Sequence, residues 1–472
     1  MQSLQVDVAI LGSGTAGLSA YRAATQAGKR AVMIENGPYG TTCARVGCMP
    51  SKLLIAAAES AQHIRESAPF GVHSSSPEIN GREVMDRVRR ERDRFVNFVI
   101  DDIESFPEAD RLRGHARFIE PHLIQVDDHT QVRAANMVIA TGSRPNVPAP
   151  FQAAGDRLVI NDDVFEWDEL PQSVAVFGPG VIGLELGQAL HRLGVNIRLF
   201  GRGGLVGPLQ DEAIRQYAEH TFAEEFPLHA DAQVEDIRRE QDQVVIRFYH
   251  PDRARVIEER FDYLLAATGR RPNVDQLNIE AAGLKLDTQG VPEFDSSTLQ
   301  CVNQDGTPSH IFISGDANND KPLLHEASDE GRIAGHNAAH FPQVNPGHRR
   351  TPISVVFSDP QLAMAGETLP QLKQRLSESQ LAIGEVSFEN QGRSRVMRIN
   401  KGLLRVYADK STGQLLGMEM VGPRAEHIAH LLAWSIQQQL TIKQLLEMPF
   451  YHPVIEEGVR TALRDVAHQL IQ

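Results

Sequence analysis

The stretch from Val6 to Gly17 reads VDVAILGSGTAG and joins an apolar run to a Gly-x-Gly-x-x-Gly turn. The apolar run predicts a buried strand, and residues 18–27, which follow the turn, are typical of a helix. A second strand is expected over residues 30–34, with Glu35 at its end. This order of strand, glycine turn, helix and strand is typical of a βαβ unit that binds a dinucleotide.

The same order returns in the second third of the chain. An apolar run at 174–177 leads into GPGVIG at Gly178 to Gly183, and a helix to residue 193 and a strand over 196–200 are expected next. Each copy also ends in a similar phrase, ATGSRPN at 140–146 and ATGRRPN at 267–273. One glycine motif alone is weak evidence, but its repetition in this context predicts an α/β protein with two Rossmann-like dinucleotide-binding domains.

Size and charge exclude several classes of protein. A chain of 472 residues is too long for one core, and its net charge of -14 argues against nucleic-acid binding. No apolar run approaches the ~18 residues of a transmembrane helix. The short lead from Met1 into the glycine motif fits no targeting peptide, so a cytoplasmic protein is expected.

Two of the three cysteines, Cys43 and Cys48, lie close together in the sequence. Such a pair in a reducing compartment indicates redox or metal chemistry, and metal is the weaker alternative because no nearby Cys or His completes a four-ligand zinc site. In an undistorted helix the two thiols would be too far apart to bridge. Gly47 and Pro50 predict an irregular helix, in which a disulfide is feasible. Lys52 shares a helix face with Cys48 and would stabilise negative charge on a thiolate or a reduced flavin.

A second candidate pair lies near the C-terminus. His452 is followed by Pro453, which suits the first position of a helix, and Glu456 and Glu457 come one turn later. A histidine held by a carboxylate is a general acid–base pair. The alternative is a capping histidine with two acids that complement the helix dipole. The residues alone favour neither interpretation.

The two glycine motifs differ at the end of their second strands. Glu35 would accept hydrogen bonds from ribose hydroxyls, whereas the second copy has Gly201 followed by Arg202. An arginine there can pair with a 2′-phosphate, and Arg198 lies one strand turn earlier. The alternative is that Arg202 is only a surface charge, and Gly183 is the third glycine typical of NAD sites. We expect both coenzymes to work, with a modest preference for NADP(H).

The Cys-x4-Cys pair followed by Pro-Ser-Lys, just after the first glycine motif, closely resembles the dihydrolipoamide dehydrogenase branch of the pyridine nucleotide-disulfide oxidoreductases. The resemblance covers essentially the whole chain. It implies a homodimer in which hydride passes between nicotinamide and FAD, and the flavin exchanges electrons with Cys48. Cys43 would exchange with the external dithiol or disulfide, and His452 with Glu457 would act on it across the dimer interface. A pair of Lys52 with Glu185 beside flavin N5 is also implied.

The resemblance divides the chain into four parts. Residues 1–150 form the first part of an FAD-binding domain, 151–274 an NAD(P)-binding domain, 275–349 the second FAD part, and 350–472 a C-terminal α+β dimerisation domain. The implied FAD contacts are Gly12, Gly14, Gly17, Glu35, Thr42, Lys52, Ala116, Thr141, Gly142, Gly315, Asp316 and Leu324. The implied NAD(P) contacts are Gly178, Gly180, Val181, Ile182, Gly183, Arg202, Val234 and Gly269. No metal site is implied.

Several positions depart from the family patterns, among them Gly201, which replaces the acid typical of NAD-using members. Thr41 replaces the usual second glycine, and Arg45 replaces an asparagine, which makes it a candidate determinant of the disulfide that is accepted. Pro208 stands where NADPH-using glutathione reductases carry a second arginine. Dihydrolipoamide on an acyltransferase partner is the expected substrate. The alternatives are an NADPH-dependent reductase of another disulfide, similar to glutathione reductase, and a non-enzymatic flavin-bound subunit.

Overall fold

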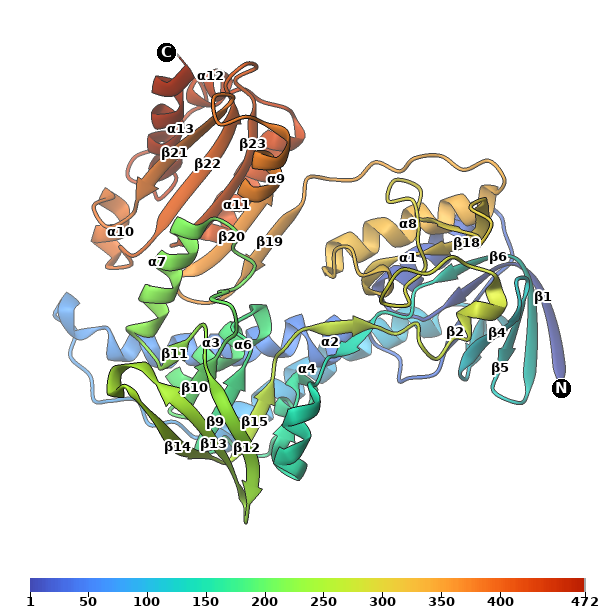
Figure 1. The fold of residues 1–472 in the computed structure, drawn as a ribbon, viewed down its shortest axis with the longest axis horizontal. Helices are drawn as coiled ribbons and strands as arrows, with labels where there is room; N and C mark the ends of the chain where they lie inside the picture. The colour runs from blue at the N-terminus through green and yellow to red at the C-terminus, as the bar shows by residue number, and fades with distance from the viewer. Residues whose placement is uncertain (471–472) are drawn as a thin grey trace. The chain divides into compact units, whose positions relative to one another are not determined.

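The computed structural model describes residues 1–470, which form two compact units (Figure 1). The first unit comprises residues 1–53, 87–146 and 269–349, and the second comprises 54–86, 147–268 and the described residues from Arg350 onward. Each unit contains one parallel sheet with a glycine turn, as the repeated motif predicts. The α/β fold class, with two Rossmann-like sheets and a C-terminal α+β domain, is confirmed. The four-part domain division stays a prediction.

The first unit is built on a sheet with the strand order β17-β18-β6-β1-β2-β3, which is parallel from β18 to β3. Its strands are β1 (Gln2–Leu11), β2 (Ala31–Glu35), β3 (Arg111–Arg113), β6 (Thr130–Ile139), β17 (Gln300–Val302) and β18 (Pro308–Ile313). Helices α1 (Thr15–Gln26) and α8 (Leu324–His340) share one hydrophobic core with Val8 and Ile10 of β1. Ala9 and Leu11 face the other core, which the hairpin of β4 (Ala116–Glu120) and β5 (Leu123–Val126) covers.

Helices α1 and α8 lie side by side although they are far apart in the chain (Figure 1). A Cβ added at Gly331 would lie 2.1 Å from the backbone oxygen of Ala16, and one at Gly335 would lie 2.3 Å from that of Ala20. The two helices therefore touch backbone to backbone, which only glycine permits. This contact fixes the middle of α8 against the helix that follows the first glycine turn.

The second unit contains a parallel sheet with the strand order β11-β10-β9-β15-β8. Its strands are β8 (Leu158–Val159), β9 (Ser173–Phe177), β10 (Asn196–Phe200), β11 (Leu228–His229) and β15 (Tyr263–Ala266). Helices α6 (Val181–Arg192) and α7 (Glu212–Ala223) accompany it, and β12 (Val234–Glu240), β13 (Gln243–His250) and β14 (Arg255–Phe261) form a separate antiparallel sheet.

The C-terminal part of this unit is an antiparallel sheet with the order β19-β20-β23-β22-β21. Its strands are β19 (Ile353–Val356), β20 (Gln361–Gly366), β21 (Leu381–Ser387), β22 (Leu403–Asp409) and β23 (Leu415–Gly422). Helices α11 (Ala425–Gln437) and α13 (Glu457–Leu470) pack on it in one core. Strands β22 and β23 contain the apolar runs at 403–407 and 415–420, and helices α11 and α13 follow them in the sequence.

A buried polar network joins α7 to this C-terminal sheet. Asp211 caps α7 by accepting the Ala213 N–H, and its Oδ2 accepts the hydroxyl of Tyr407 at 2.9 Å. Arg405 Nη1 lies 3.1 Å from Asp211 Oδ1. The buried Glu419 accepts the backbone N–H of Asp211 at 2.9 Å. Charged groups thus connect the second dinucleotide-binding sheet with the C-terminal sheet.

Three further α-helices lie between β2 and β3 in the sequence. They are α2 (Thr42–Val46), α3 (Cys48–Arg65) and α4 (Gly81–Glu104). Helix α4 carries most of the charge-rich stretch at 82–110 and ends at Glu104. Among residues 1–470, no helix combines the length and the apolar composition that crossing a membrane requires.

Candidate active site

The first glycine turn has the close contacts that its motif predicts. Gly12 has a φ of +109°, and a Cβ there would lie 2.3 Å from the backbone oxygen of Ala140. A Cβ on Gly17 would lie 2.0 Å from the oxygen of Gly12. A Cβ on Gly14, in contrast, would meet no atom within 4 Å. The first and third glycines therefore serve packing, and the second exposes backbone to a ligand.

The second glycine turn repeats this pattern. A Cβ on Gly178 would lie 2.3 Å from the oxygen of Ala267, and one on Gly183 would lie 1.8 Å from the oxygen of Gly178. Gly180 again faces open space. The other expected NAD(P) contacts lie at element ends: Val181 and Ile182 begin α6, Val234 begins β12, Gly269 follows β15 with φ +92°, and Arg202 follows β10.

A cavity of about 380 Å³ opens beside the first glycine turn. The expected FAD contacts that line it are Gly12, Gly14, Glu35, Thr42, Ala116, Thr141 and Gly142. Within residues 1–470 the buried Thr141 Oγ1 has no hydrogen-bond partner. An exposed glycine backbone and an orphan hydroxyl in one cavity fit the diphosphate and polar chain of FAD. Arg45 also lines this cavity, which places its side chain on the cofactor side of the cysteine segment.

Glu35 is fixed at the end of β2 by the glycine turn itself. Its Oε2 accepts hydrogen bonds from Ser13, at 2.9 Å from the backbone nitrogen and 3.0 Å from Oγ. Its Oε1 accepts the Gly37 N–H at 2.8 Å. The carboxylate therefore holds one orientation at the cavity wall, where a ribose hydroxyl can replace a local donor.

Asp316 lies in the short turn η6 (Gly315–Asn318). Ser143 Oγ donates a 2.6 Å hydrogen bond to Asp316 Oδ2, and Arg270 Nε donates to Ser143 Oγ at 2.8 Å. Ser143 and Arg270 were not among the expected site residues. They follow the two Ala-Thr-Gly phrases, and β7 (Ser143–Pro145) pairs antiparallel with β16 (Arg270–Pro272). The repeated phrase was the available signal, because its two copies pair with each other. Leu324 begins α8.

The cysteine segment is an interrupted helix, as predicted. Helix α2 ends before Gly47, whose φ of -123° and ψ of -116° are not helical, and α3 begins at Cys48. A Cβ on Gly47 would lie 3.1 Å from the oxygen of Thr42, so the chain bends tightly there. The bend brings the thiols into contact: a hydrogen bond with Cys48, followed by burial, raises the pKa of Cys43. Both are free thiols, and their disulfide stays a prediction.

Lys52 and Glu185 belong to different compact units, so their pairing stays a prediction. Lys52 lies on α3, and its Nζ donates to Ser51 Oγ at 3.3 Å. Glu185 lies on α6 with only 4% of its surface exposed, and its Oε1 accepts the backbone N–H of Phe357 at 3.0 Å. Ile55, less than one turn after Lys52 on α3, lines the same small cavity as Glu185.

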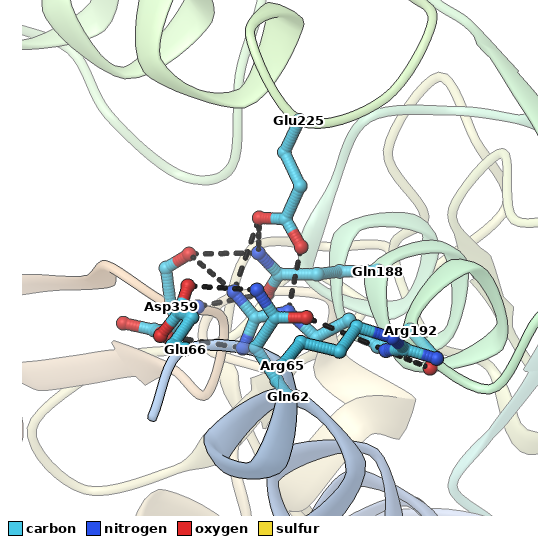
Figure 2. Close-up of polar contacts among 7 residues, drawn as sticks. All are labelled: Gln62, Arg65, Glu66, Gln188, Arg192, Glu225 and Asp359. Atoms are coloured by element: carbon cyan, nitrogen blue, oxygen red, sulfur yellow. Dashed lines mark hydrogen bonds and ion pairs between the residues drawn. The ribbon is translucent and has the colours of Figure 1, made fainter. Parts of the chain in front are cut away.

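A cluster of polar side chains holds α6 in the second unit (Figure 2). Arg192 Nε donates to Glu225 Oε1 at 2.6 Å, and its Nη1 lies 3.0 Å from Asp359 Oδ2. Gln188 Nε2 donates to Glu225 Oε2 and to the Asp359 oxygen, both at 2.7 Å. Arg65, the last residue of α3, donates to the Arg192 oxygen at 2.6 Å. The helix that carries Glu185 is therefore fastened to the end of α3 and to the loop after β19.

The expected acid–base pair is close in space. His452 Nδ1 lies 3.0 Å and 3.1 Å from the two oxygens of Glu457, and the histidine is 81% exposed. The hydrogen bond between the two side chains lowers the pKa of Glu457. The expectation that Pro453 begins a helix is wrong, because α13 begins at Glu457. The Glu457 carboxylate accepts the Val454 N–H and so caps the turn that precedes the helix.

The coenzyme segment after β10 leaves no room for a side chain at Gly201. A Cβ there would lie 2.5 Å from the oxygen of Ala230 and 2.7 Å from Cγ of Pro179. The next residue, Arg202, is exposed. Close packing in this turn therefore requires glycine at position 201. Arg202, which follows it directly, is the charged residue closest to this position in the sequence.

Arg198 does not supply a free cation here. Its Nε and Nη2 donate to the two oxygens of Glu259 at 2.6 Å and 2.8 Å, and Nη1 lies 2.6 Å from His229 Nε2. Arg198 is therefore already paired, and any contribution to a 2′-phosphate contact stays a prediction. A bidentate carboxylate already occupies the guanidinium.

Two family models match the chain. Residues 6–331 match the pyridine nucleotide-disulphide oxidoreductase model, and residues 353–463 match the dimerisation domain of the same enzymes. The chain belongs to this family. It is therefore a flavoprotein disulfide oxidoreductase. Enzymes of this family use FAD and NAD(P). The dimerisation domain supports a homodimer.

Full-length relatives carry several names. The dihydrolipoyl dehydrogenase of Chlamydia pneumoniae is 27% identical over 459 residues, covering 96% of this chain and 95% of its own. The mercuric reductase of Acidithiobacillus ferrooxidans is 27% identical over 488 residues, covering 99% and 84%. The solved HOCl-induced flavoprotein disulfide reductase RclA from Escherichia coli superposes with a TM-score of 0.80 at 22% identity, covering 98% and 99%. That likeness supports the fold.

Proposed function

We propose that the protein is a dihydrolipoamide dehydrogenase-like enzyme, in which electrons pass between a dithiol or disulfide, the Cys43–Cys48 pair, FAD and NAD(P). The observation that carries the proposal is the broken helix at Gly47, which brings the two thiols together. The segment that bears them also contributes Thr42 and Arg45 to the wall of the dinucleotide cavity. The similar full-length dihydrolipoyl dehydrogenases support the substrate class.

The thiol chemistry balances without other reactants. In the reducing direction, Cys43 attacks the substrate disulfide, so that one mixed disulfide forms and one substrate sulfur leaves as a thiolate. His452 of the partner subunit gives that thiolate a proton. Cys48 then attacks Cys43, the internal disulfide forms, and the second substrate sulfur leaves and takes a proton. The substrate gains two electrons and two protons, and oxidation of a dithiol is the reverse sequence.

The remaining residues orient these steps. When bound, FAD carries two electrons between the nicotinamide and the cysteine pair. We assign Glu35 and Asp316 to hydroxyl groups of FAD, and the open backbone at Gly14 to its diphosphate. Lys52 would hold negative charge near the flavin, with Glu185 as its partner.

We infer that both NAD(H) and NADP(H) are accepted, with a modest preference for NADP(H). Gly201 leaves no carboxylate to repel a 2′-phosphate, and the exposed Arg202 follows it directly. Two features limit the size of this preference. Arg198 is paired with Glu259, and Pro208 stands where a second arginine could contact the phosphate.

A second candidate is an NADPH-dependent reductase of another disulfide. Arg202 favours this alternative because it can pair with the 2′-phosphate of NADPH. Arg45 adds a positive charge two residues from Cys43, which can change the disulfide that Cys43 accepts. A non-enzymatic subunit would be expected to lack one of the catalytic side chains, yet all of them are present in the sequence.

The test is a comparison of two coenzymes against two disulfides, lipoamide and glutathione disulfide, with kcat/KM as the measured quantity. The proposed function predicts the highest value with lipoamide and measurable turnover with a lipoyl-bearing acyltransferase domain. A higher value with glutathione disulfide would replace the first candidate with the second. No thiol-dependent turnover of either disulfide would overturn both.

A further inference from the structure

A buried carboxylate supports the turn that carries Asp316. Glu330 lies on α8 with 0% of its surface exposed. Its Oε2 accepts the backbone N–H of Gly315 at 2.8 Å and the side-chain amide of Asn318 at 2.7 Å. One oxygen therefore holds both ends of η6, the turn that runs from Gly315 to Asn318.

The turn itself has little freedom to move. Gly315 has a φ of +67°, and a Cβ there would lie 3.0 Å from the Cβ of Ala16 on α1. Helices α1 and α8 are already in backbone contact through Gly331. The position of Asp316 is therefore set by two constraints together, the close packing at Gly315 and the hydrogen bonds that Glu330 accepts from the turn.

Arg349 is the cation that faces this buried carboxylate. Its Nη2 lies 2.8 Å from Glu330 Oε1 and 3.1 Å from Glu326 Oε2. The contact with Glu330 is an ion pair without hydrogen-bond alignment, since Oε1 accepts no hydrogen bond from residues 1–470. Nη1 donates to the backbone oxygen of Ser296 at 3.2 Å, and the side chain is only 18% exposed. The guanidinium is thus held in place from two sides.

Several carboxylates surround Arg349, and its positive charge compensates their negative charges. Glu326 and Glu330 are both buried, and Asp320 lies 3.5 Å from the same Arg349 nitrogen. Burial raises the pKa of Glu330, and the charge of Arg349 acts against that rise. A buried carboxylate that loses its cation is costly, whereas removal of both charges is much less so.

We propose that Arg349 is a positioning residue for flavin binding, acting through Glu330 to hold the turn that presents Asp316. The inference goes beyond the proposed function, because it concerns retention of FAD whatever the disulfide is. It rests on that proposal only for the contact between Asp316 and FAD. Arg349 touches neither the cofactor cavity nor the cysteines in this arrangement, so its effect on the flavin is transmitted through the turn.

The experiment measures FAD release from the holoenzyme by the recovery of flavin fluorescence. In Arg349→Met, Glu330 loses its cation and the hydrogen bonds to the turn weaken. Hydrogen bonds to a charged group are worth enough to change an equilibrium by about 10- to 150-fold. We expect the dissociation constant for FAD to rise within that range. Arg332→Met is the matched control, since Arg332 is an exposed arginine of α8, the helix that carries Glu330, and it should leave FAD affinity unchanged.

Rescue distinguishes positioning from a general loss of stability. Glu330→Gln removes the buried charge but keeps an oxygen for the Gly315 N–H. The double variant Glu330→Gln with Arg349→Met should therefore bind FAD several-fold more tightly than Arg349→Met alone. Urea unfolding of each apoprotein reports stability separately. If Arg349→Met does not fold, Arg349→Lys keeps the charge, and we expect an intermediate FAD affinity.

Two results would overturn the inference. One is an FAD affinity of Arg349→Met, or of Arg349→Lys if only that folds, equal to that of Arg332→Met. The other is a double variant that binds FAD no better than Arg349→Met. Asp316→Asn tests the proposed contact of Asp316 with FAD separately from the role of Arg349. If this variant binds FAD like the wild type while Arg349→Met loses affinity, the Asp316 contact is wrong and the role of Arg349 stands.

Discussion

His452 and Glu457 form a contact in which the histidine uses only Nδ1, at 3.0 Å and 3.1 Å from the two carboxylate oxygens. The other ring nitrogen, Nε2, is the one left to exchange a proton with a substrate. We predict that His452→Ala lowers disulfide turnover by about 10²- to 10⁴-fold, the range for loss of a general acid–base. FAD content and reduction of the flavin by the nicotinamide should stay near wild type. Rapid-reaction absorbance of the flavin measures both steps.

The dimer gives this prediction a second test. If His452 serves the cysteine of the other subunit, a mixed dimer of Cys43→Ser and His452→Ala chains keeps one complete site. Some activity should then survive, although each parent homodimer is nearly inactive. A mixed dimer as inactive as its parents would place the acid–base pair and the cysteines of one site within a single chain.

The contact between the two thiols predicts which of them ionises. Because the hydrogen bond with Cys48 and burial raise the pKa of Cys43, Cys43 should keep its proton above the ordinary thiol value of about 8.5. Cys48 is therefore the residue that we expect to face the flavin as a thiolate in the reduced enzyme. We predict a long-wavelength charge-transfer band between this thiolate and oxidised FAD, retained in Cys43→Ser and absent in Cys48→Ser. Full disulfide turnover by both variants would rule out the redox pair.

The coenzyme prediction concerns the residue after Gly201. A charge-assisted contact is worth about 1.5–3 kcal/mol, or roughly 10- to 150-fold in discrimination. Arg202→Glu should therefore turn a modest preference for NADP(H) into one for NAD(H), measured as the ratio of kcat/KM values. Arg253→Glu offers a charge-matched control in the same unit. Strict NAD(H) use by the wild type, unchanged in Arg202→Glu, would show that Arg202 is only a surface charge.

The buried network around Asp211 predicts a stability effect away from the chemistry. Tyr407→Phe removes the 2.9 Å hydrogen bond to the Asp211 carboxylate without changing the size of the ring. We expect the free energy of unfolding to fall by about 1.5–3 kcal/mol, as for other hydrogen bonds to charged groups. Urea unfolding measures it, and Tyr249→Phe at the exposed Tyr249 is the control. Equal stability of the two variants would mean that the Asp211 network contributes little.

The repeated glycine motif made the architecture predictable, because its strands, turns and helices carry local signals. The break at Gly47 was predictable for the same reason. The start of α13 was not, since the Glu457 side chain caps the preceding turn and no local rule ranks it above Pro453. The pairing of Arg198 with Glu259 could not be predicted from the sequence either, because the two residues come together only when β10 and β14 are placed in space. Ser143 and Arg270 gain their role from the pairing of two repeated phrases, a long-range contact.

The contact between Gly201 and its neighbours constrains how coenzyme choice can change during evolution. Glutamate at this position is a single substitution away in sequence, yet its Cβ would overlap both Cγ of Pro179 and the backbone oxygen of Ala230. Replacing Pro179 first would remove only one of the two obstacles. A lineage that turns toward NAD(H) is therefore expected to change Arg202, and to keep Gly201 until the backbone at Ala230 has moved.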